Sequence, residues 1–217
     1  MNNNTLIKEP SQTADSSIIW LHGLGASAND FAPIVPILNL PNTRFIFPNA
    51  PVRPVTLNMG IEMPAWYDIF SLDRFSKQDE AGIKASAQTV GSLIQAEVDK
   101  GIKTERIVLA GFSQGAAMVL YTGTRFEHKL AGILALSGYL PLGDQLAAEK
   151  SHANLNTPIF IAHGDYDAVV PPNFAELTMD TLNQAGFSPT LNRYPMEHSV
   201  SDQEVRDIRE RLRAWQI

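Results

Sequence analysis

A short pentapeptide between an apolar run and a helix-forming run constrains this chain more than any other feature. Residues 107–110, Ile-Val-Leu-Ala, form an apolar, β-branched run that predicts a buried strand. Residues 116–120, Ala-Ala-Met-Val-Leu, favour a helix. Between them lies Gly-Phe-Ser-Gln-Gly at 111–115, with Ser113 at its centre. Gly-x-Ser-x-Gly between a strand and a helix is typical of a nucleophile elbow, a sharp turn that exposes a serine hydroxyl.

The two glycines of this pentapeptide have a steric role. In so sharp a turn the backbone passes close to itself, so a Cβ atom at Gly111 or Gly115 would collide with it. The following helix directs its first N–H groups and its positive dipole end at whatever Ser113 attacks. The pentapeptide alone is a weak signal. The strand before it and the helix after it favour a nucleophile over a purely structural turn.

The composition excludes several other classes of protein. A length of 217 residues, 44% of them hydrophobic and 18% charged, predicts one soluble globular domain. The net charge of −6, without a cluster of Lys and Arg, argues against a nucleic-acid partner. The absence of cysteine excludes disulfides, cysteine-based zinc sites and a thiol nucleophile. We expect neither a metal nor a cofactor.

The N-terminal residues favour a cytoplasmic protein. Residues 1–17 are polar and lack the apolar core of a secretory signal. No stretch approaches the length of a transmembrane helix. We expect residues 1–15 to be a flexible leader or an edge strand, followed by a single domain over 16–217.

Strand and helix patterns alternate along the chain, and most of the strands are continuously apolar. This combination predicts an α/β fold with a mostly parallel central sheet covered by helices on both faces. Strands are expected at 17–21, 43–47, 107–110, 130–138, 158–162 and 189–194, and helices at 29–38, 79–99, 116–120, 173–185 and 201–215, with another inside 143–156.

Residues 48–78 interrupt this alternation. They contain four prolines, yet they are rich in large apolar side chains. A long apolar segment between regular elements is usually functional, so we interpret it as a lip beside the active site. The alternative is a loop that simply packs on the core.

A serine nucleophile needs a base, and the base needs an orienting acid. In an elbow-type sheet the order along the chain is serine, acid, histidine. Of the five histidines, only His198 follows the plausible acids, so it is the expected general base. Asp165 and Asp167 both follow the same predicted strand, and spacing does not separate them. Weaker candidates are Asp144 and Glu197.

An oxyanion hole needs two backbone N–H groups. One is expected from Gln114, the residue after the nucleophile. The other is expected from Leu24 in the glycine-rich loop at 22–25, which follows an early strand. We expect His22 to brace this loop by hydrogen bonds. A metal-binding role for His22 with His163 and Asp165 has no ligand spacing behind it.

Six motifs together resemble a known family. They occur in order over nearly the whole chain and are much more specific than the pentapeptide alone. The motifs are LHGLGAS (21–27), FPNAPVRPVT (47–56), AWYDI (65–69), GFSQG (111–115), HGDYDAVVP (163–171) and YPMEHSV (194–200). With these motifs, the chain resembles the bacterial carboxylesterase and acyl-protein thioesterase family of α/β-hydrolases, also called the phospholipase/carboxylesterase family.

The resemblance implies an α/β-hydrolase fold without a large cap domain. Matched motif by motif, it implies Ser113 as nucleophile, His198 as base and Asp167 as acid, and it leaves Asp165 to shape the loop. Leu24 and Gln114 match the oxyanion donors of the family.

The same resemblance implies that residues 52–77 line an acyl channel. The candidate acyl contacts that it implies are Leu57, Ile61, Met63 and Trp66, with Val170 on the opposite wall.

The expected function is hydrolysis of carboxylic esters or thioesters through an acyl-enzyme. The substrate could be a small ester, a lysophospholipid or an acylated protein. Two other classes remain open: a non-catalytic binding module of the same fold, and a serine peptidase. Exposed apolar residues of the lip would also suit peripheral lipid contact or a homodimer; these are Leu57, Met59, Ile61 and Met63.

Overall fold

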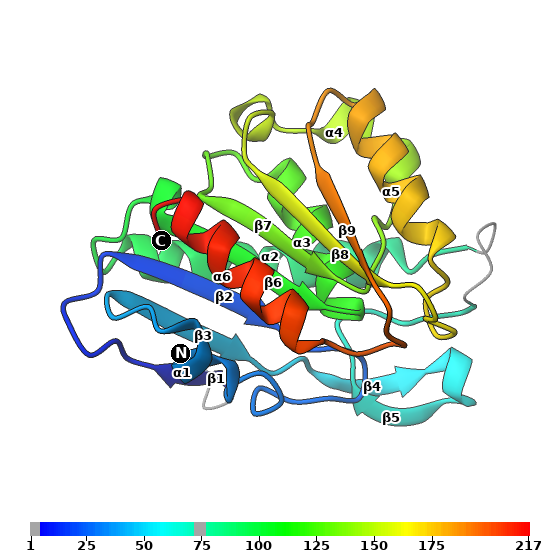
Figure 1. Ribbon diagram of the computed structural model, residues 1–217. Coiled ribbons are helices and arrows are strands. Elements are labelled where there is room, and N and C mark those ends of the chain that lie inside the picture. The colour runs from blue at the N-terminus through cyan, green and yellow to red at the C-terminus, as the bar shows by residue number, and fades with distance from the viewer. Residues whose placement is uncertain (1–4, 72–76) are drawn as a thin grey trace.

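The computed structural model describes residues 5–71 and 77–217 and contains a seven-stranded sheet in the order β1-β3-β2-β6-β7-β8-β9 (Figure 1). A separate hairpin is formed by β4 and β5. The strands are β1 (Thr5–Lys8), β2 (Ser16–Leu21), β3 (Thr43–Pro48), β4 (Val52–Val55), β5 (Ile61–Pro64), β6 (Ile107–Phe112), β7 (Gly132–Leu136), β8 (Ile159–Gly164) and β9 (Thr190–Tyr194). The helices are α1 (Ile34–Leu38), α2 (Glu80–Val98), α3 (Gln114–Arg125), α4 (Leu146–Glu149), α5 (Asn173–Gln184) and α6 (Asp202–Ala214).

The sheet is parallel except at one edge. Strands β3, β2, β6, β7, β8 and β9 pair in parallel, and β1 pairs antiparallel with β3. This confirms the predicted mostly parallel α/β architecture. Residues 5–8 of the expected leader are therefore an ordered edge strand, not a flexible segment.

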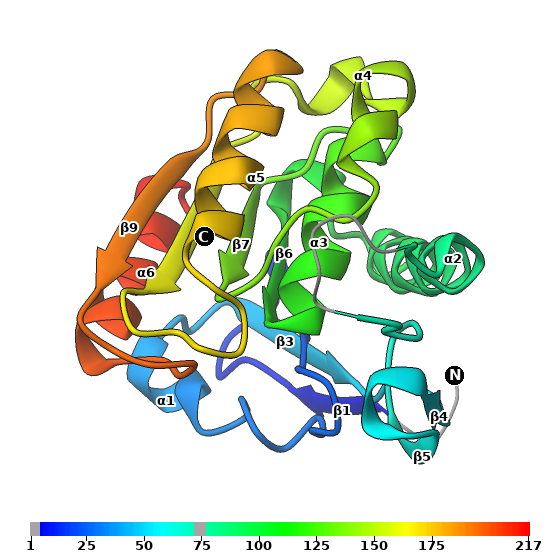
Figure 2. The same ribbon diagram turned by 90° about the vertical axis from the view of Figure 1, so that its right-hand side faces the viewer.

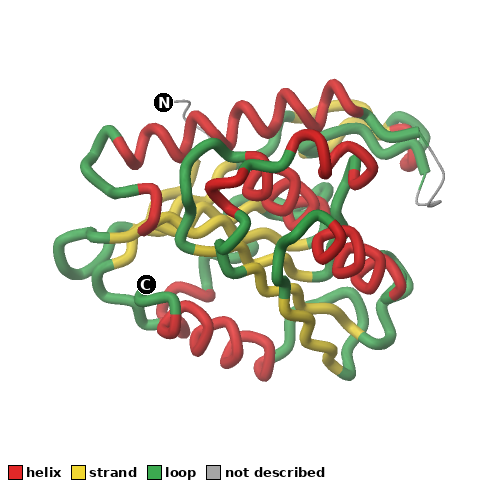
Figure 3. Tube along the Cα trace, turned by 90° about the horizontal axis from the view of Figure 1, so that it is seen from above, coloured by secondary structure: helices red, strands yellow, loops and turns green. Residues whose placement is uncertain are grey.

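Helices cover both faces of the sheet. Figure 2 shows α6 on one side of the strands and α2 on the other, and Figure 3 shows the strands as a band between helices. Each face carries its own apolar cluster, one under α2, α3 and α5 and the other under α1 and α6. Strand β6 serves both faces, because Ile107 and Leu109 lie in the first cluster and Val108 and Ala110 in the second.

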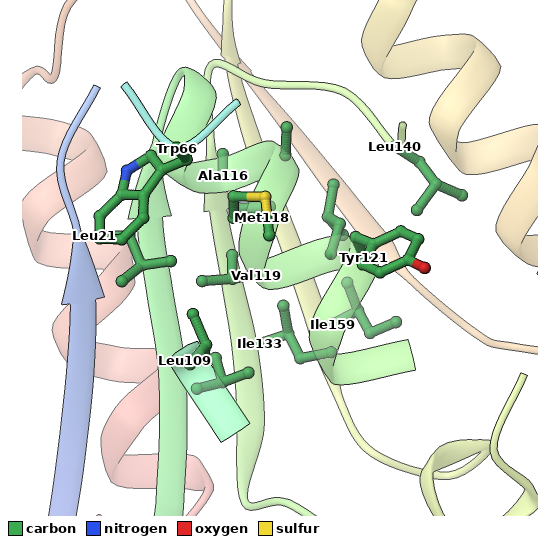
Figure 4. Packing of buried hydrophobic residues seen from close by; sticks show 14 of the residues in the cluster. Leu21, Trp66, Leu109, Ala116, Met118, Val119, Tyr121, Ile133, Leu140 and Ile159 are labelled. Atoms are coloured by element: carbon green, nitrogen blue, oxygen red, sulfur yellow. The ribbon is translucent and has the colours of Figure 1, made fainter. Parts of the chain in front are cut away.

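Helix α3 lies in the middle of the larger cluster, directly after the central strand. Figure 4 shows Met118 and Val119 of α3 packed among side chains that include Leu109 of β6 and Ile133 of β7. Every residue of α3 from Gln114 to Thr124 is buried. The start of this helix is therefore held by packing on both the sheet and the neighbouring helices.

One predicted helix is shorter than expected, and another lies inside its predicted segment. Helix α1 begins only at Ile34, after Pro33, and neither Asn29 nor Asp30 caps it. Asp30 instead accepts a hydrogen bond from Ser27 Oγ. The segment 143–156 contains the four-residue helix α4 between two 3-10 turns.

Side chains cap the first turns of α2 and α6. Asp79 caps α2 by accepting a hydrogen bond from the N–H of Gly82. Ser201 caps α6 by accepting one from the N–H of Glu204. No helix in the described residues is long and apolar enough to span a membrane.

The β4–β5 hairpin stands apart from the main sheet (Figure 1). Its tip is apolar and exposed: Met59 is 90% exposed and Ile61 is 56% exposed. Its base returns to the core, where Trp66 and Tyr67 are buried. The predicted lip is thus an exposed hairpin continued by a buried segment.

Candidate active site

Ser113 lies at the turn between β6 and α3, as the pentapeptide predicts. Its backbone has φ 55° and ψ −117°, a conformation that L-residues rarely adopt. A Cβ atom at position 111 would overlap the carbonyl oxygen of Gly115, and one at 115 would overlap that of Leu21. The steric argument is therefore confirmed for Gly111, whereas the backbone that excludes a Cβ atom at Gly115 belongs to the neighbouring strand β2 and not to the turn itself.

The side chains of Ser113, His198 and Asp167 form one continuous hydrogen-bonded chain. Nε2 of His198 lies 2.9 Å from Oγ of Ser113. Nδ1 of His198 lies 2.7 Å from Oδ2 of Asp167. Because an ionised carboxylate only accepts hydrogen bonds, Nδ1 of His198 carries the proton and Nε2 is free to accept one from the serine. The ring of His198 also packs against Phe112, with centroids 4.8 Å apart.

The backbone around Asp167 holds its carboxylate in place. Its Oδ1 accepts hydrogen bonds from the N–H groups of Val169, at 2.9 Å, and Val170, at 2.8 Å. This leaves Oδ2 directed at His198. Asp165, the alternative that spacing left open, is instead paired with Arg193, with Nε 2.9 Å from Oδ1.

A second buried histidine supports this loop. Nε2 of His163 lies 2.8 Å from the carbonyl oxygen of Val170, so it must carry a proton and donate it there. The same nitrogen is 3.5 Å from Oδ2 of Asp167. Burial lowers the pKa of His163, which favours its neutral form. Sequence reasoning considered this histidine only as a metal ligand and did not predict that it supports the loop.

The loop at 22–25 runs directly beside the nucleophile. A Cβ atom at Gly23 would lie 3.3 Å from Cβ of Ser113. In the described part of the chain, the amide N–H groups of Leu24 and Gln114 donate to no other protein group. Two unpaired N–H groups beside a serine hydroxyl can hold a developing oxyanion.

His22 braces this loop, as expected. Nδ1 of His22 lies 2.7 Å from the carbonyl oxygen of Gly23, and Nε2 accepts from the N–H of Ala50 at 3.0 Å. These fixed backbone partners require the neutral ring with its proton on Nδ1. Burial lowers the pKa of His22 and thereby favours that neutral form.

Ser113 opens into a cavity of about 560 Å³. Of the five candidate acyl contacts, Leu57 and Val170 line this cavity. The other three do not: Ile61 and Met63 lie on the hairpin, and Trp66 is buried in the core with its ring 5.3 Å from that of His22.

The cavity has lining residues that sequence reasoning did not single out as contacts: four lie inside a named motif, Phe31 follows one by four residues, and Tyr139 lies outside every motif. They are Phe31, Tyr67, Ile69, Phe112, Tyr139 and Val169. The hydroxyls of Tyr67 and Tyr139 lie 2.9 Å apart, and burial raises the pKa of both phenols. In the described residues, no group of three or more His, Asp or Glu side chains could hold a metal ion.

Comparisons with known proteins show which family this chain is similar to. A family model described as phospholipase/carboxylesterase matches residues 2–216. Acyl-protein thioesterase 1 of Neurospora crassa is 42% identical over 209 residues, which cover 91% of this chain and 85% of that protein. Acyl-protein thioesterase 1 of Cryptococcus neoformans is 37% identical over 92% of both chains.

A solved plant structure extends the similarity to three dimensions. The crystal structure of Zea mays acyl-protein thioesterase 2 covers 99% of this chain and 99% of its own, with a TM-score of 0.87 and 30% identity. Because these relatives are fungal and plant proteins, the resemblance is not specific to bacterial members of the family.

Proposed function

This chain belongs to the phospholipase/carboxylesterase family, and we propose that Ser113, His198 and Asp167 are its catalytic triad. The chain is a serine hydrolase that cleaves carboxylic esters or thioesters. The observation that carries the assignment of residues is the unbroken chain of hydrogen bonds from Ser113 Oγ through His198 to Asp167. It begins at a serine held in an elbow and ends at a buried carboxylate.

In the proposed mechanism, Oγ of Ser113 attacks the carbonyl carbon while Nε2 of His198 takes its proton. The amides of Leu24 and Gln114 hold the oxyanion. His198 then protonates the departing alcohol, whereas a thiolate leaves with less assistance. Water, deprotonated by His198, attacks the acyl-serine and releases the acid. Asp167 fixes the tautomer of His198 and stabilises its charged form.

The proposed substrates are acylated proteins or lipids whose acyl group enters the cavity beside Ser113. The names of the fungal relatives point to acylated proteins. An alkyl chain suits this cavity, because the apolar side chains of Leu57, Ile69 and Val170 line it. The alternative substrates are lysophospholipids and small esters, which also contain a carboxylic ester bond that Ser113 can attack.

The test is kcat/KM over p-nitrophenyl esters from acetyl to palmitoyl, together with an S-acylated peptide. A thiol reagent can detect the thiol that is released when the peptide is deacylated, because the enzyme itself has no cysteine that would react. Ser113→Ala should lose more than about 10³-fold in kcat and keep only the contribution of the oxyanion hole and binding. Turnover retained in this variant would refute the triad. A preference for acetyl over all longer chains would favour small esters as substrates.

We further propose that the enzyme is cytoplasmic and that its hairpin contacts lipid surfaces. Met59 and Ile61 on the hairpin are exposed, and Tyr166 and Val169 are exposed on the loop that carries Asp167. Leu57 of the hairpin and Val169 of the loop also line the cavity, so both exposed segments border it. Apolar side chains gathered at a cavity entrance suit a membrane surface.

Sedimentation with phosphatidylcholine vesicles tests the lipid contact. Ile61→Asp should reduce binding, while Ile37→Asp, at a 55% exposed isoleucine on α1, should not. Equal partitioning of the wild type and both variants would remove the proposal. Sedimentation velocity tests the alternative, a homodimer formed through the hairpin. Loss of a dimer in Ile61→Asp would show that the hairpin contacts a second copy.

A further inference from the structure

The side chain of Gln114, the residue directly after the nucleophile, is not directed at bulk water. It is only 3% exposed, and both of its polar atoms bind the backbone of a distant segment. Its Oε1 accepts from the N–H of Trp66 at 2.8 Å, and its Nε2 donates to the carbonyl oxygen of Tyr67 at 2.8 Å. One amide side chain thus pairs with the backbone of two consecutive residues, Trp66 and Tyr67.

The same segment is also tied to the loop that carries the other oxyanion amide. The N–H of Gly25 donates to the carbonyl oxygen of Pro64 at 2.8 Å. The indole Nε1 of Trp66 donates to the carbonyl oxygen of His22 at 2.9 Å. These two bonds flank Leu24 on both sides along the chain. We call residues 64–67 the brace.

The brace itself is anchored in the core. Ala65, Trp66 and Tyr67 are buried. Ser86 of α2 donates a hydrogen bond from its hydroxyl to the carbonyl oxygen of Trp66. A buried segment with its backbone groups satisfied moves little, so it can act as a fixed reference for the two elements bound to it.

We propose that the side chain of Gln114 is a positioning residue that sets the separation of the two oxyanion amides through the brace. The inference rests on the proposed triad and oxyanion hole and adds a role for a side chain to a residue implicated only through its backbone. Leu24 and Gln114 lie on different elements. The brace is bonded to both: to the 22–25 loop at Gly25 and His22, and to the start of α3 through the Gln114 amide.

We expect a disturbed brace to change kcat much more than KM. An oxyanion forms only in the transition state, so a displaced amide lowers kcat and leaves KM nearly unchanged. A purely structural role would instead lower the melting temperature and the fraction of active enzyme without changing kcat per active site.

Gln114→Glu gives a test with an internal rescue. An ionised carboxylate can accept from the N–H of Trp66 but repels the carbonyl oxygen of Tyr67. A protonated carboxyl group accepts a hydrogen bond from the N–H of Trp66 and donates one to the carbonyl oxygen of Tyr67, as the amide of Gln114 does. Burial and the facing carbonyl should raise the pKa of this carboxyl. We expect kcat about 10- to 100-fold below wild type at pH 8, a loss typical of misplaced catalytic groups. The ratio of variant to wild-type kcat should rise toward pH 5.5.

Gln114→Met is the matched control, because it fills a similar volume but makes neither bond. Its kcat should be low at every pH, with no rise in the ratio. A ratio for Gln114→Glu that is flat with pH, or a kcat within about twofold of wild type in both variants, would overturn the proposal, since lost positioning costs more than that.

Trp66→Phe tests the other end of the brace without touching the Gln114 bonds. It removes the indole bond to His22 together with part of a buried ring, so it should lower kcat with KM unchanged and also lower the melting temperature. Combined with Gln114→Glu at pH 8, it should cost less than the product of the two single losses, because both act through the same segment. Strictly multiplicative losses would contradict a shared brace.

Labelling with a fluorophosphonate distinguishes this inference from the proposed triad. The Gln114 variants keep Ser113 and should still be labelled, more slowly than wild type. Ser113→Ala should not be labelled at all. Turnover by Ser113→Ala would refute the triad, whereas labelled but fully active Gln114 variants would refute only the positioning role.

Discussion

Asp167 and His198 are 31 residues apart in the chain, yet Oδ2 of Asp167 lies 2.7 Å from Nδ1 of His198. The link exists because β8 and β9 are parallel neighbours, so the loops after them meet at one edge of the sheet. The other oxygen, Oδ1, is held by the N–H groups of Val169 and Val170. The orientation of the carboxylate is thus set by the backbone.

Asp167→Asn tests this relationship. The Asn oxygen can keep the two backbone bonds, and its NH₂ group then faces Nδ1 of His198. Nδ1 would have to lose its proton, and the protonated Nε2 could no longer accept one from Ser113. We expect kcat to fall about 10³- to 10⁴-fold with little change in folding. Asp165→Asn is the control and should stay within about twofold, because surface ion pairs contribute little.

The glycines of the elbow should be intolerant of substitution. Gly115→Ala places a Cβ atom against the carbonyl oxygen of Leu21, which the sheet holds in place. We expect a loss of about 3 kcal/mol or more in the free energy of unfolding, as for other severe backbone clashes. Gly91→Ala in α2 meets nothing within 4 Å and should stabilise by about 0.5–1 kcal/mol. Urea denaturation measures both, and equal effects would contradict the steric argument.

Glu204 should make the fold sensitive to alkaline pH. The residue is fully buried at the start of α6, and burial raises the pKa of its carboxyl to about 8. In the unfolded chain the pKa is about 4.3, so between these values the folded state holds a proton that the unfolded state has lost. This contribution to stability is complete below the lower pKa, decreases as pH rises and is lost above the higher one.

Glu204→Gln, which stays neutral, should therefore be more stable relative to wild type at pH 9 than at pH 5. Thermal unfolding of both proteins at the two pH values measures the difference. If the gap in melting temperature were the same at both, the carboxyl of Glu204 would not be titrating in the folded protein.

The cavity geometry predicts which hairpin residues select the acyl group. Leu57→Trp should fill part of the cavity and shift the preference toward short acyl chains, because Leu57 lies in its wall. Ile61→Trp should leave the chain-length profile unchanged, because Ile61 lies outside the cavity on the exposed hairpin. Measurement of kcat/KM over the p-nitrophenyl ester series gives the chain-length profile of both variants. A shift in Ile61→Trp alone would place the acyl group outside this cavity.

Local sequence determined most of the framework of this protein. The apolar runs predicted the parallel strands because burial on both faces requires them, and the predicted ranges 79–99 and 201–215 contain α2 and α6. Gly111 helped to reveal the elbow because its constraint is steric and lies within five residues, whereas the constraint on Gly115 comes from Leu21 of a distant strand. The order of residues along the chain selected His198.

Tertiary structure decided what depends on the direction of a side chain. Spacing could not separate Asp165 from Asp167; the family resemblance pointed to Asp167, and the pairing of β8 with β9 places Asp165 against Arg193 and Asp167 against His198. Trp66 carries an apolar side chain in an apolar segment, which suits a cavity wall and a core equally well, and only packing placed it in the core.

The contacts of the brace could not be predicted from the sequence either. Gln114 and Trp66 are 48 residues apart, and no local pattern states which backbone groups an amide side chain will meet. Sequence determined which residues can perform the chemistry, because sterics and periodicity are local. The fold alone decided which of them face one another, because that depends on how strands distant in the chain pair.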